Sequence, residues 1–260
     1  MSLLSWIVLF TLLGGVLSVL AAALFLLLPE SRRARALPAM VSFAIGALLG
    51  AAFLAVLPHA LSAPGVRDMH AITTTVLLGL LGFFVLEKMV LWRHCHIHEC
   101  ETHAPDPVRC RASASGYLIL FGDGVHNFVD GVLIAAAFMT DVHLGVVTAL
   151  AVAAHEIPQE VGDFAILLHS GFSRSKALLY NVLASLTTVV GGVLAYFSLG
   201  VAQVVLPYVL AVAASSFIYI AVADLIPGLH KRLEPRVTLE QVLLIGTGVL
   251  TIYFTHTVLH

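Results

Sequence analysis

The chain has 260 residues, of which 60% are hydrophobic and 11% are charged, and its mean hydropathy is +1.01. Soluble domains usually carry about 25% charged residues, so this composition excludes an ordinary soluble domain and indicates a membrane protein. The formal net charge of −2 and the lack of a long basic stretch argue against a nucleic-acid partner.

A membrane-spanning helix needs about 20 mostly apolar residues, and the chain offers eight such segments. We expect spans at 4–28, 38–60, 71–92, 116–140, 143–169, 176–199, 203–228 and 238–258. The first segment is too long for a signal-peptide core and lacks a basic leader, so we interpret it as a retained helix. The predicted fold is an all-α, polytopic bundle forming one domain over residues 1–260.

Basic residues between the predicted spans indicate the orientation of the chain in the membrane. They are Arg32, Arg33, Arg35, Arg93, Arg109, Arg111, Arg174, Lys176, Lys231, Arg232 and Arg236 in alternate loops, with only Arg67 in the others. Loops rich in lysine and arginine stay in the cytoplasm. This alternation predicts that both termini are extracytoplasmic and that residues 93–115 form a cytoplasmic loop.

The fourth span, "GYLILFGDGVHNFVDGVLIAAAFM", carries four polar residues that a helix would place on one face. At 100° per residue, Asp123, His126, Asn127 and Asp130 fall within an arc of about 100°. The fifth span contains "HEIPQEVGDF", and its polar residues fall within an arc of about 140°. These residues are His155, Glu156, Gln159, Glu160 and Asp163.

Only a short connection around Asp141 joins these two spans, so they are expected to pack as neighbours with their polar faces together. An acidic residue at the centre of a bilayer costs about 2.5–3.5 kcal/mol, which makes exposure of these acids to lipid unfavourable. A polar network that only joins helices is the alternative, but ionisable residues inside a membrane usually mark a functional site.

The residue types indicate a transition-metal site. His126 and Asp130 are spaced i, i+4, as are His155 and Gln159, so each pair lies on one helix face. Imidazole and carboxylate ligands suit zinc and other first-row divalent ions, and Asn127 and Gln159 add carbonyl oxygens. Because neither polar stripe contains cysteine, Cu(I) is disfavoured.

Further polar and proline residues are candidates for an ion pathway. Asp123, Glu160 and Asp163 extend the polar stripes, and Asp224 is either a pathway residue or a polar group that pairs helices. Pro158 frees the backbone carbonyl of Ala154 beside the predicted ligands. Further breaks within spans are expected at Pro58, Pro207 and Pro227.

The predicted cytoplasmic loop contains "RHCHIHECETHAPDPVRC", which is rich in histidine and cysteine. His94, His96, His98 and His103 predict a metal-receiving or regulatory loop, with a solvated linker as the alternative. Disulfides among Cys95, Cys100 and Cys110 are not expected in the cytoplasm. Four further histidines near span ends are interpreted as interfacial or satisfied histidines and not as ligands: His143, His169, His256 and His260.

The motifs "GDGVHNFVDG", "HEIPQEVGDFAILL" and "SKALLYNVLASLT" together resemble the histidine-rich subfamily of the ZIP metal transporters. The resemblance implies import of zinc, and often iron, manganese or cadmium, into the cytoplasm. It also implies a homodimer, an elevator-like motion and a metal site between spans 4 and 5. The ligand positions it implies are His126, Asn127, Asp130, His155, Glu156 and Gln159.

Two departures from the subfamily pattern bear on the metal site. Gln159 stands where the subfamily has a second histidine, which puts a second, adjacent metal in doubt. Ala55 stands where a histidine is often found, while His59 after Pro58 matches the subfamily pattern. The large outer domain of many animal members is not present in the sequence, which suggests a bacterial protein in a cell membrane, the inner membrane in a Gram-negative cell.

The expected function is therefore transport of Zn²⁺ or a related divalent ion, without enzymatic activity and without an organic cofactor. An intramembrane metalloprotease is one alternative, because "HEIPQ" is similar to the first part of the zinc-protease motif H-E-x-x-H. Gln159 in place of the second histidine and the proline in the ligand turn count against it. A metal sensor without transport is the other alternative.

Overall fold

The computed structural model describes residues 2–64, 66, 68–96, 107–201, 203–230 and 234–259. All regular elements in this part of the chain are helical. The α-helices are α1 (Leu3–Gly14), α2 (Val16–Phe25), α3 (Glu30–Gly50), α4 (Leu57–Ser62), α5 (Met69–His96), α6 (Pro107–Thr140), α7 (Val142–His169), α8 (Arg174–Val201), α9 (Leu206–Tyr219), α10 (Ile226–Leu229) and α11 (Pro235–Leu259). Two π-helical segments, η1 (Ala51–Val56) and η3 (Ile220–Leu225), and one 3-10 segment, η2 (Gln203–Val205), complete the order.

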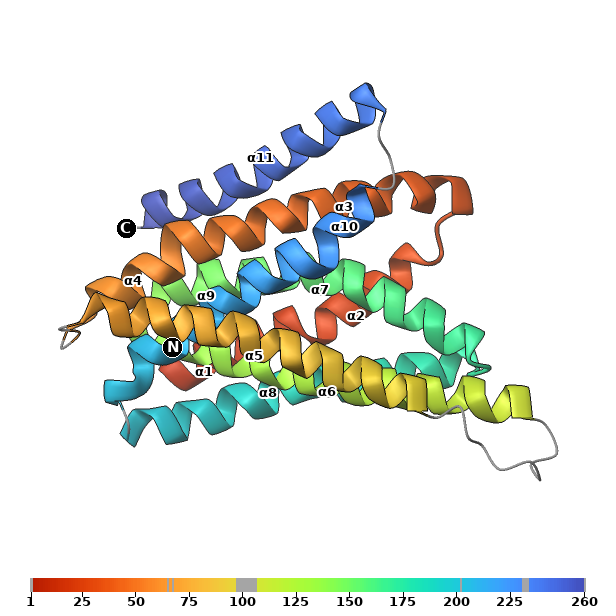
Figure 1. The fold of residues 1–260 in the computed structure, drawn as a ribbon, viewed down its shortest axis with the longest axis horizontal. Helices are drawn as coiled ribbons and strands as arrows, with labels where there is room; N and C mark the ends of the chain where they lie inside the picture. Colours follow the sequence, from red (N-terminus) through yellow and green to blue (C-terminus); the bar gives the residue numbers. More distant parts are fainter. Residues whose placement is uncertain are drawn as a thin grey trace.

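The long helices lie side by side along the longest axis of the molecule (Figure 1). Seven stretches of the described residues are long and apolar enough to cross a membrane, and each overlaps a predicted span. The helix α7 is not among the seven, although it has 28 residues, since it carries the intramembrane acids of the predicted fifth span. The all-α, multi-pass class is confirmed.

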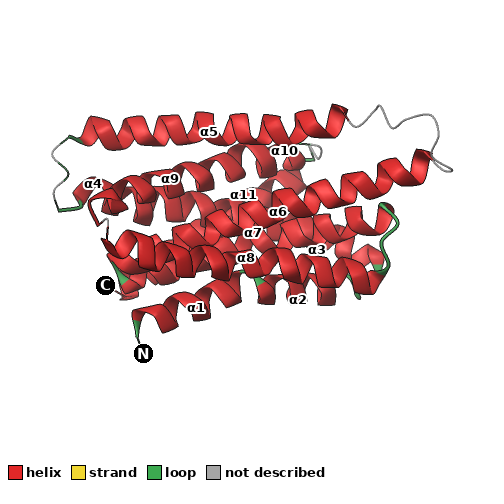
Figure 2. Ribbon diagram, turned by 90° about the horizontal axis from the view of Figure 1, so that it is seen from below, coloured by secondary structure: helices red, strands yellow, loops and turns green. Residues whose placement is uncertain are grey.

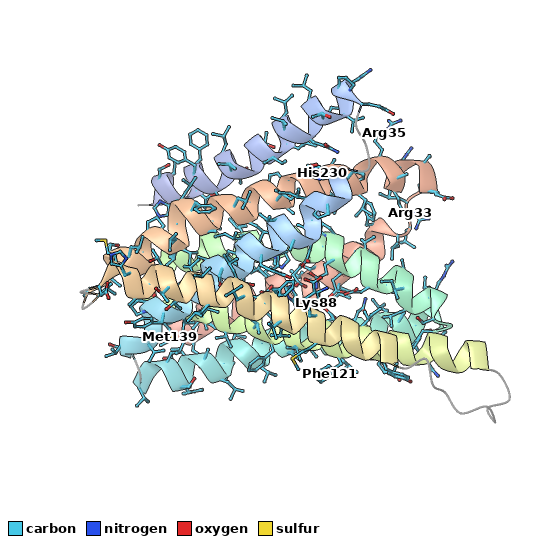
Figure 3. All side chains as sticks on the ribbon, viewed as in Figure 1. Arg33, Arg35, Lys88, Phe121, Met139 and His230 are labelled. Atoms are coloured by element: carbon cyan, nitrogen blue, oxygen red, sulfur yellow. The ribbon has the colours of Figure 1, made fainter. Side chains whose placement is uncertain are left out.

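The two ends of the bundle differ in the connections they contain (Figure 1). Both termini and the α4–α5 connection lie at one end, which we call the terminal end. The helix ends that flank the α2–α3, α5–α6, α7–α8 and α10–α11 connections lie at the other, which we call the basic end. Arg33 and Arg35 are at the basic end, far from Met139 (Figure 3). The predicted basic loops therefore share one end.

The helix boundaries shorten the predicted histidine-rich loop. The helix α5 continues to His96 and α6 begins at Pro107, so both reach into the range 93–115. The predictions for His98, His103 and Cys100, and for the side chains of His94, His96, Cys95 and Cys110, lie outside the described residues.

Two proline-containing helices are interrupted in a similar way. The π segment η1 directly precedes α4, in which Pro58 is the second residue, and η3 directly precedes α10, in which Pro227 is the second residue. A proline removes one backbone donor and pushes its ring against the preceding turn, which favours a local change in winding.

Figure 2 shows α5 along one face of the bundle and α1 and α2 along the opposite face.

Backbone contacts hold the helices around α6 in place. A Cβ atom added at Gly131 of α6 would collide with the carbonyl oxygen of Thr188 on α8. Small residues allow membrane helices to approach this closely and to gain van der Waals contact along their length. Between α6 and α7 the connection is Asp141 alone, and its carboxylate caps α7 by accepting from the backbone N–H groups of His143 and Leu144. Together these contacts set the position of α6 relative to both neighbours.

Candidate metal centre

Four side chains from the polar stripes of α6 and α7 converge in the interior of the bundle. They are His126 and Asp130 of α6 and His155 and Glu156 of α7. Each offers one nitrogen or oxygen atom, and these four atoms all lie within 4.8 Å of one another. The predicted meeting of the two stripes is therefore present, and we call this group the tetrahedral site for the geometry described next.

Five of the six separations between the ligand atoms of the tetrahedral site are close to the edges of a tetrahedron around a small ion. The Nε2 atoms of His126 and His155 are 3.2 Å apart. Asp130 Oδ2 is 3.3 Å from His155 Nε2 and 3.7 Å from His126 Nε2. Glu156 Oε1 is 3.4 Å from His126 Nε2 and 3.7 Å from His155 Nε2. Four ligands at the usual zinc distances would be about 3.3–3.6 Å apart, so the site needs little rearrangement to hold zinc.

The burial of these groups also points to a cation. The side chains of Asp130, His155 and Glu156 are each 1% exposed, whereas His126 is 23% exposed. Both carboxylate oxygens of Asp130 and of Glu156 are buried without a hydrogen-bond partner among the described residues. Burying a carboxylate without compensation is expensive, and a divalent ion supplies that compensation. His126 is the one ligand through which the site can be reached.

The ring of His155 is oriented by its own helix. Its Nδ1 lies 3.1 Å from the carbonyl oxygen of Ala151, one turn earlier in α7. A carbonyl oxygen can only accept, so Nδ1 of the neutral ring carries the proton and Nε2 presents its lone pair to the site. This contact holds His155 in the tautomer that a metal requires.

Asn127 and Gln159, the two predicted amide ligands, are placed differently from the four clustered residues. The amide nitrogen of Asn127 donates to Asp123 Oδ1 at 2.8 Å, and its carbonyl oxygen accepts from the hydroxyl of Thr188 at 2.7 Å. In this arrangement Asn127 joins α6 to α8. Gln159 is half-buried and lines a cavity next to His126.

That cavity has a volume of about 490 Å³ and runs from the tetrahedral site toward the basic end. Its polar lining consists of His126, Asp123, Gln159, Asp163, Glu87, Ser216, Tyr219 and Asp224. Asp123 precedes His126 in a helix that starts at the basic end, and Asp163 follows the ligands in a helix that ends there. Both acids therefore lie between the tetrahedral site and the basic end.

The remaining predicted pathway residues fall into two groups. Glu160 is fully buried, its two carboxylate oxygens have no hydrogen-bond partner among the described residues, and it interacts electrostatically with Asp123 and Asp163. Asp224 is exposed within η3 and lines the cavity together with Glu87. The hydroxyl of Tyr219 donates to the carboxylate of Glu87.

Sequence reasoning missed Thr188, Ala151 and Glu87. Thr188 is one of several hydroxyl residues in the apolar helix α8, so its type did not single it out. Ala151 acts through its backbone carbonyl, which no side-chain pattern reveals. Glu87 could have been found as an acid within the third apolar segment, where ionisable groups are rare.

The chain shares extensive similarity with known metal transporters. The model of the family described as ZIP Zinc transporter matches residues 92–256. Zinc transporter ZIP13 of Mus musculus is 33% identical over 277 residues, which covers 92% of this chain and 75% of that protein. Zinc transporter ZIP13 of Pongo abelii is 34% identical over 227 residues, covering 81% of this chain and 64% of that protein.

Similarity to another relative is higher but more local. Zinc transporter ZIP4 of Homo sapiens is 45% identical over 120 residues, which covers 46% of this chain and 18% of that protein. The chain thus spans less than two thirds of the Pongo abelii ZIP13 and of human ZIP4. The family match covers more than half of the chain and includes all four residues of the tetrahedral site. The chain belongs to the ZIP family and is a multi-pass membrane protein.

Proposed function

We propose that the protein carries a divalent metal ion, zinc first among them, through the membrane by way of the tetrahedral site. The observation that supports this most directly is the group of four ligand atoms buried between two long helices, all within 4.8 Å of one another and with imidazole–imidazole and imidazole–carboxylate distances of 3.2–3.7 Å. Two imidazole nitrogens and two carboxylate oxygens suit zinc better than the all-oxygen sets that calcium and magnesium prefer. The names of the relatives, all zinc transporters, agree with this choice.

The ion is released through the cavity toward the basic end. Asp123 and Asp163 line the cavity beyond the tetrahedral site, Glu160 is buried and interacts electrostatically with both, and Asp224 lines the cavity nearer that end. Oxygen ligands spaced along a cavity allow an ion to leave one set of ligands for the next, since each contact is weak enough to exchange. Because the basic end carries the arginine-rich connections, it faces the cytoplasm, and the chain crosses the membrane eight times with α7 as the fifth span.

The geometry argues against the protease alternative. A catalytic zinc keeps one coordination position for water, whereas here four side chains each offer one ligand atom. Glu156, which would serve as the general base, is itself one of the ligand groups. This arrangement therefore favours transport over proteolysis.

Uptake by purified protein in lipid vesicles tests the proposal. Zinc, cadmium, iron and manganese are supplied outside, and accumulation is compared between the wild type and His126→Ala. We expect zinc uptake by the wild type and its loss in His126→Ala, because His126 is a proposed ligand and the one of the four that is partly exposed. The matched control is His143→Ala, which removes a 40% exposed imidazole at the start of α7 and should keep uptake. Binding of zinc by the wild type without any uptake would identify a sensor instead.

The resemblance to ZIP transporters also leads us to propose a homodimer as the assembled form. Light scattering of the purified protein in detergent measures the mass of the assembly directly. A monomer at concentrations that support uptake would refute the dimer without affecting the transport proposal.

A further inference from the structure

A second pair of imidazoles lies at the terminal end of the bundle. His59 of α4 and His256 of α11 have ring centroids 5.5 Å apart and ring planes at 78°. His126 and His155 of the tetrahedral site have ring centroids 5.5 Å apart and ring planes at 79°. The two pairs thus share their centroid distance and interplanar angle, although they come from different helices. In one of them this arrangement brings two Nε2 atoms to within 3.2 Å.

The orientation of His59 repeats that of His155. Its Nδ1 lies 2.8 Å from the carbonyl oxygen of Ala55, four residues earlier, as His155 Nδ1 lies near the carbonyl oxygen of Ala151. Because the carbonyl oxygen accepts, the neutral ring has its proton on Nδ1 and its lone pair on Nε2. This is the tautomer that metal-binding histidines adopt when their second nitrogen is held by the backbone.

The helix α11, which carries His256, packs closely against α3, which leads through η1 into the helix α4 that carries His59. Cβ atoms added at Gly46 of α3 and at Gly248 of α11 would collide with the carbonyl oxygens of Ile245 and Phe43 respectively. Backbone contact of this kind leaves little freedom for one helix to shift along the other. Since α4 continues the helix that begins with α3, His59 and His256 are presented at a set separation.

The position of the pair allows an ion to reach it. Both side chains are half-buried, and each lies three residues before the last residue of its helix. The terminal end is opposite the basic end toward which the cavity runs (Figure 1).

We propose that His59 and His256 form a second binding site for zinc or another first-row divalent ion, at the terminal end of the bundle. Two imidazole nitrogens completed by water bind such ions in an exchangeable way, because neutral nitrogen ligands lack the charge of carboxylates or thiolates. The role of this site rests on the transport function proposed above: it collects the ion on the side from which uptake begins. The binding itself does not depend on that function.

Zinc stoichiometry tests the binding. Equilibrium dialysis of the full chain in detergent is carried out on the wild type, on the double variant His59→Gln/His256→Gln, and on His70→Gln. His70 is an exposed histidine at the start of α5, near the same end, and serves as the matched control. All variants keep the histidine-rich loop and the tetrahedral site. We expect the double variant to bind about one zinc ion fewer per chain than the wild type, and His70→Gln to bind as many as the wild type.

A further comparison separates binding from a structural role. Adding His126→Ala to the double variant should remove a further zinc ion, which would demonstrate an intact tetrahedral site in the double variant. An unchanged stoichiometry in His59→Gln/His256→Gln would overturn the proposal. Loss, in the double variant, of the zinc ion that depends on His126 would also overturn the proposal. His59 and His256 would then maintain the fold instead of binding zinc.

Uptake measurements address the role in transport. In vesicles, the double variant should show a raised KM for zinc with a nearly unchanged maximal rate. The reason is that His59 and His256 would collect the ion before it reaches the tetrahedral site, ahead of the step that limits the maximal rate. A lowered maximal rate with an unchanged KM would refute the collecting role. A wild type that binds zinc at both sites but transports none would refute the transport proposal and leave the second site standing.

Discussion

The hydroxyl of Thr188 on α8 donates a hydrogen bond to Asn127 Oδ1 on α6 at 2.7 Å, and both side chains are fully buried. The amide nitrogen of Asn127 in turn donates to Asp123 Oδ1 at 2.8 Å. This chain of contacts connects a helix outside the tetrahedral site to an acid that lines the cavity. The resemblance implies that Asn127 is a ligand, and in the arrangement described its Oδ1 accepts from Thr188.

Replacing Thr188 by valine should destabilise the protein by about 1–3 kcal/mol, because Asn127 Oδ1 would remain buried without a donor. Thermal unfolding in detergent measures the effect. Thr188→Ser keeps the hydroxyl and should lose much less stability. Equal destabilisation by valine and serine would show that packing of the methyl group, and not the hydrogen bond, is what Thr188 contributes.

Replacing Glu156 by glutamine should abolish zinc uptake and lower zinc affinity by at least about tenfold. Loss of a residue that only supports a ligand already costs about 10–100-fold, and Glu156 is itself a proposed ligand. The reason is that the variant exchanges a charged ligand for a neutral one. Calorimetric titration and vesicle uptake on the same preparation provide both values. Retention of full zinc affinity together with loss of a proteolytic activity would support the metalloprotease alternative instead.

Replacing Glu160 by glutamine should slow uptake while leaving zinc affinity of the tetrahedral site within about twofold, since Glu160 is not among the four clustered ligands. The variant removes a buried, unpartnered carboxylate from the proposed path. Initial uptake rates at saturating zinc are the informative measurement. An unchanged maximal rate would remove Glu160 from the path.

Zinc should stabilise the folded protein, because the tetrahedral site exists only in the native state. At a zinc concentration 100 times the dissociation constant, the gain is about 2.7 kcal/mol and should disappear on addition of a chelator. In His155→Ala the gain should be largely lost, whereas His143→Ala should retain it. A zinc-induced shift of equal size in His155→Ala would place the stabilising ion elsewhere.

Replacing Gly131 by alanine should destabilise the protein by about 1–3 kcal/mol, because its Cβ would meet the backbone of Thr188 and force α6 and α8 apart. The control is Gly162→Ala on α7, where an added Cβ has no heavy atom within 4 Å. That substitution should be neutral or stabilise the helix by about 0.5–1 kcal/mol. Unfolding midpoints of the two variants, compared under identical detergent conditions, decide between these expectations.

Periodicity was sufficient to predict the faces of the two helices that carry the tetrahedral site. Because a helix turns by a constant angle per residue, the spacing of His126 and Asp130 determined that they share a face. The single-residue connection at Asp141 made α6 and α7 neighbours, and the cost of burying charge in lipid required the two polar faces to meet. The apolar segments themselves determined a helical, multi-pass protein.

Only the tertiary structure decided which of the aligned polar residues come within ligand distance of one another. Asn127 shares a face with His126 and Asp130, yet its carbonyl oxygen accepts from Thr188, 61 residues later in the chain. His59 and His256 are nearly 200 residues apart in sequence and meet because α3 and α11 pack backbone to backbone. The physical reason is that periodicity gives the angular position of a side chain on its own helix. The depth and rotation of that helix against its neighbours depend on close packing with residues far away in sequence.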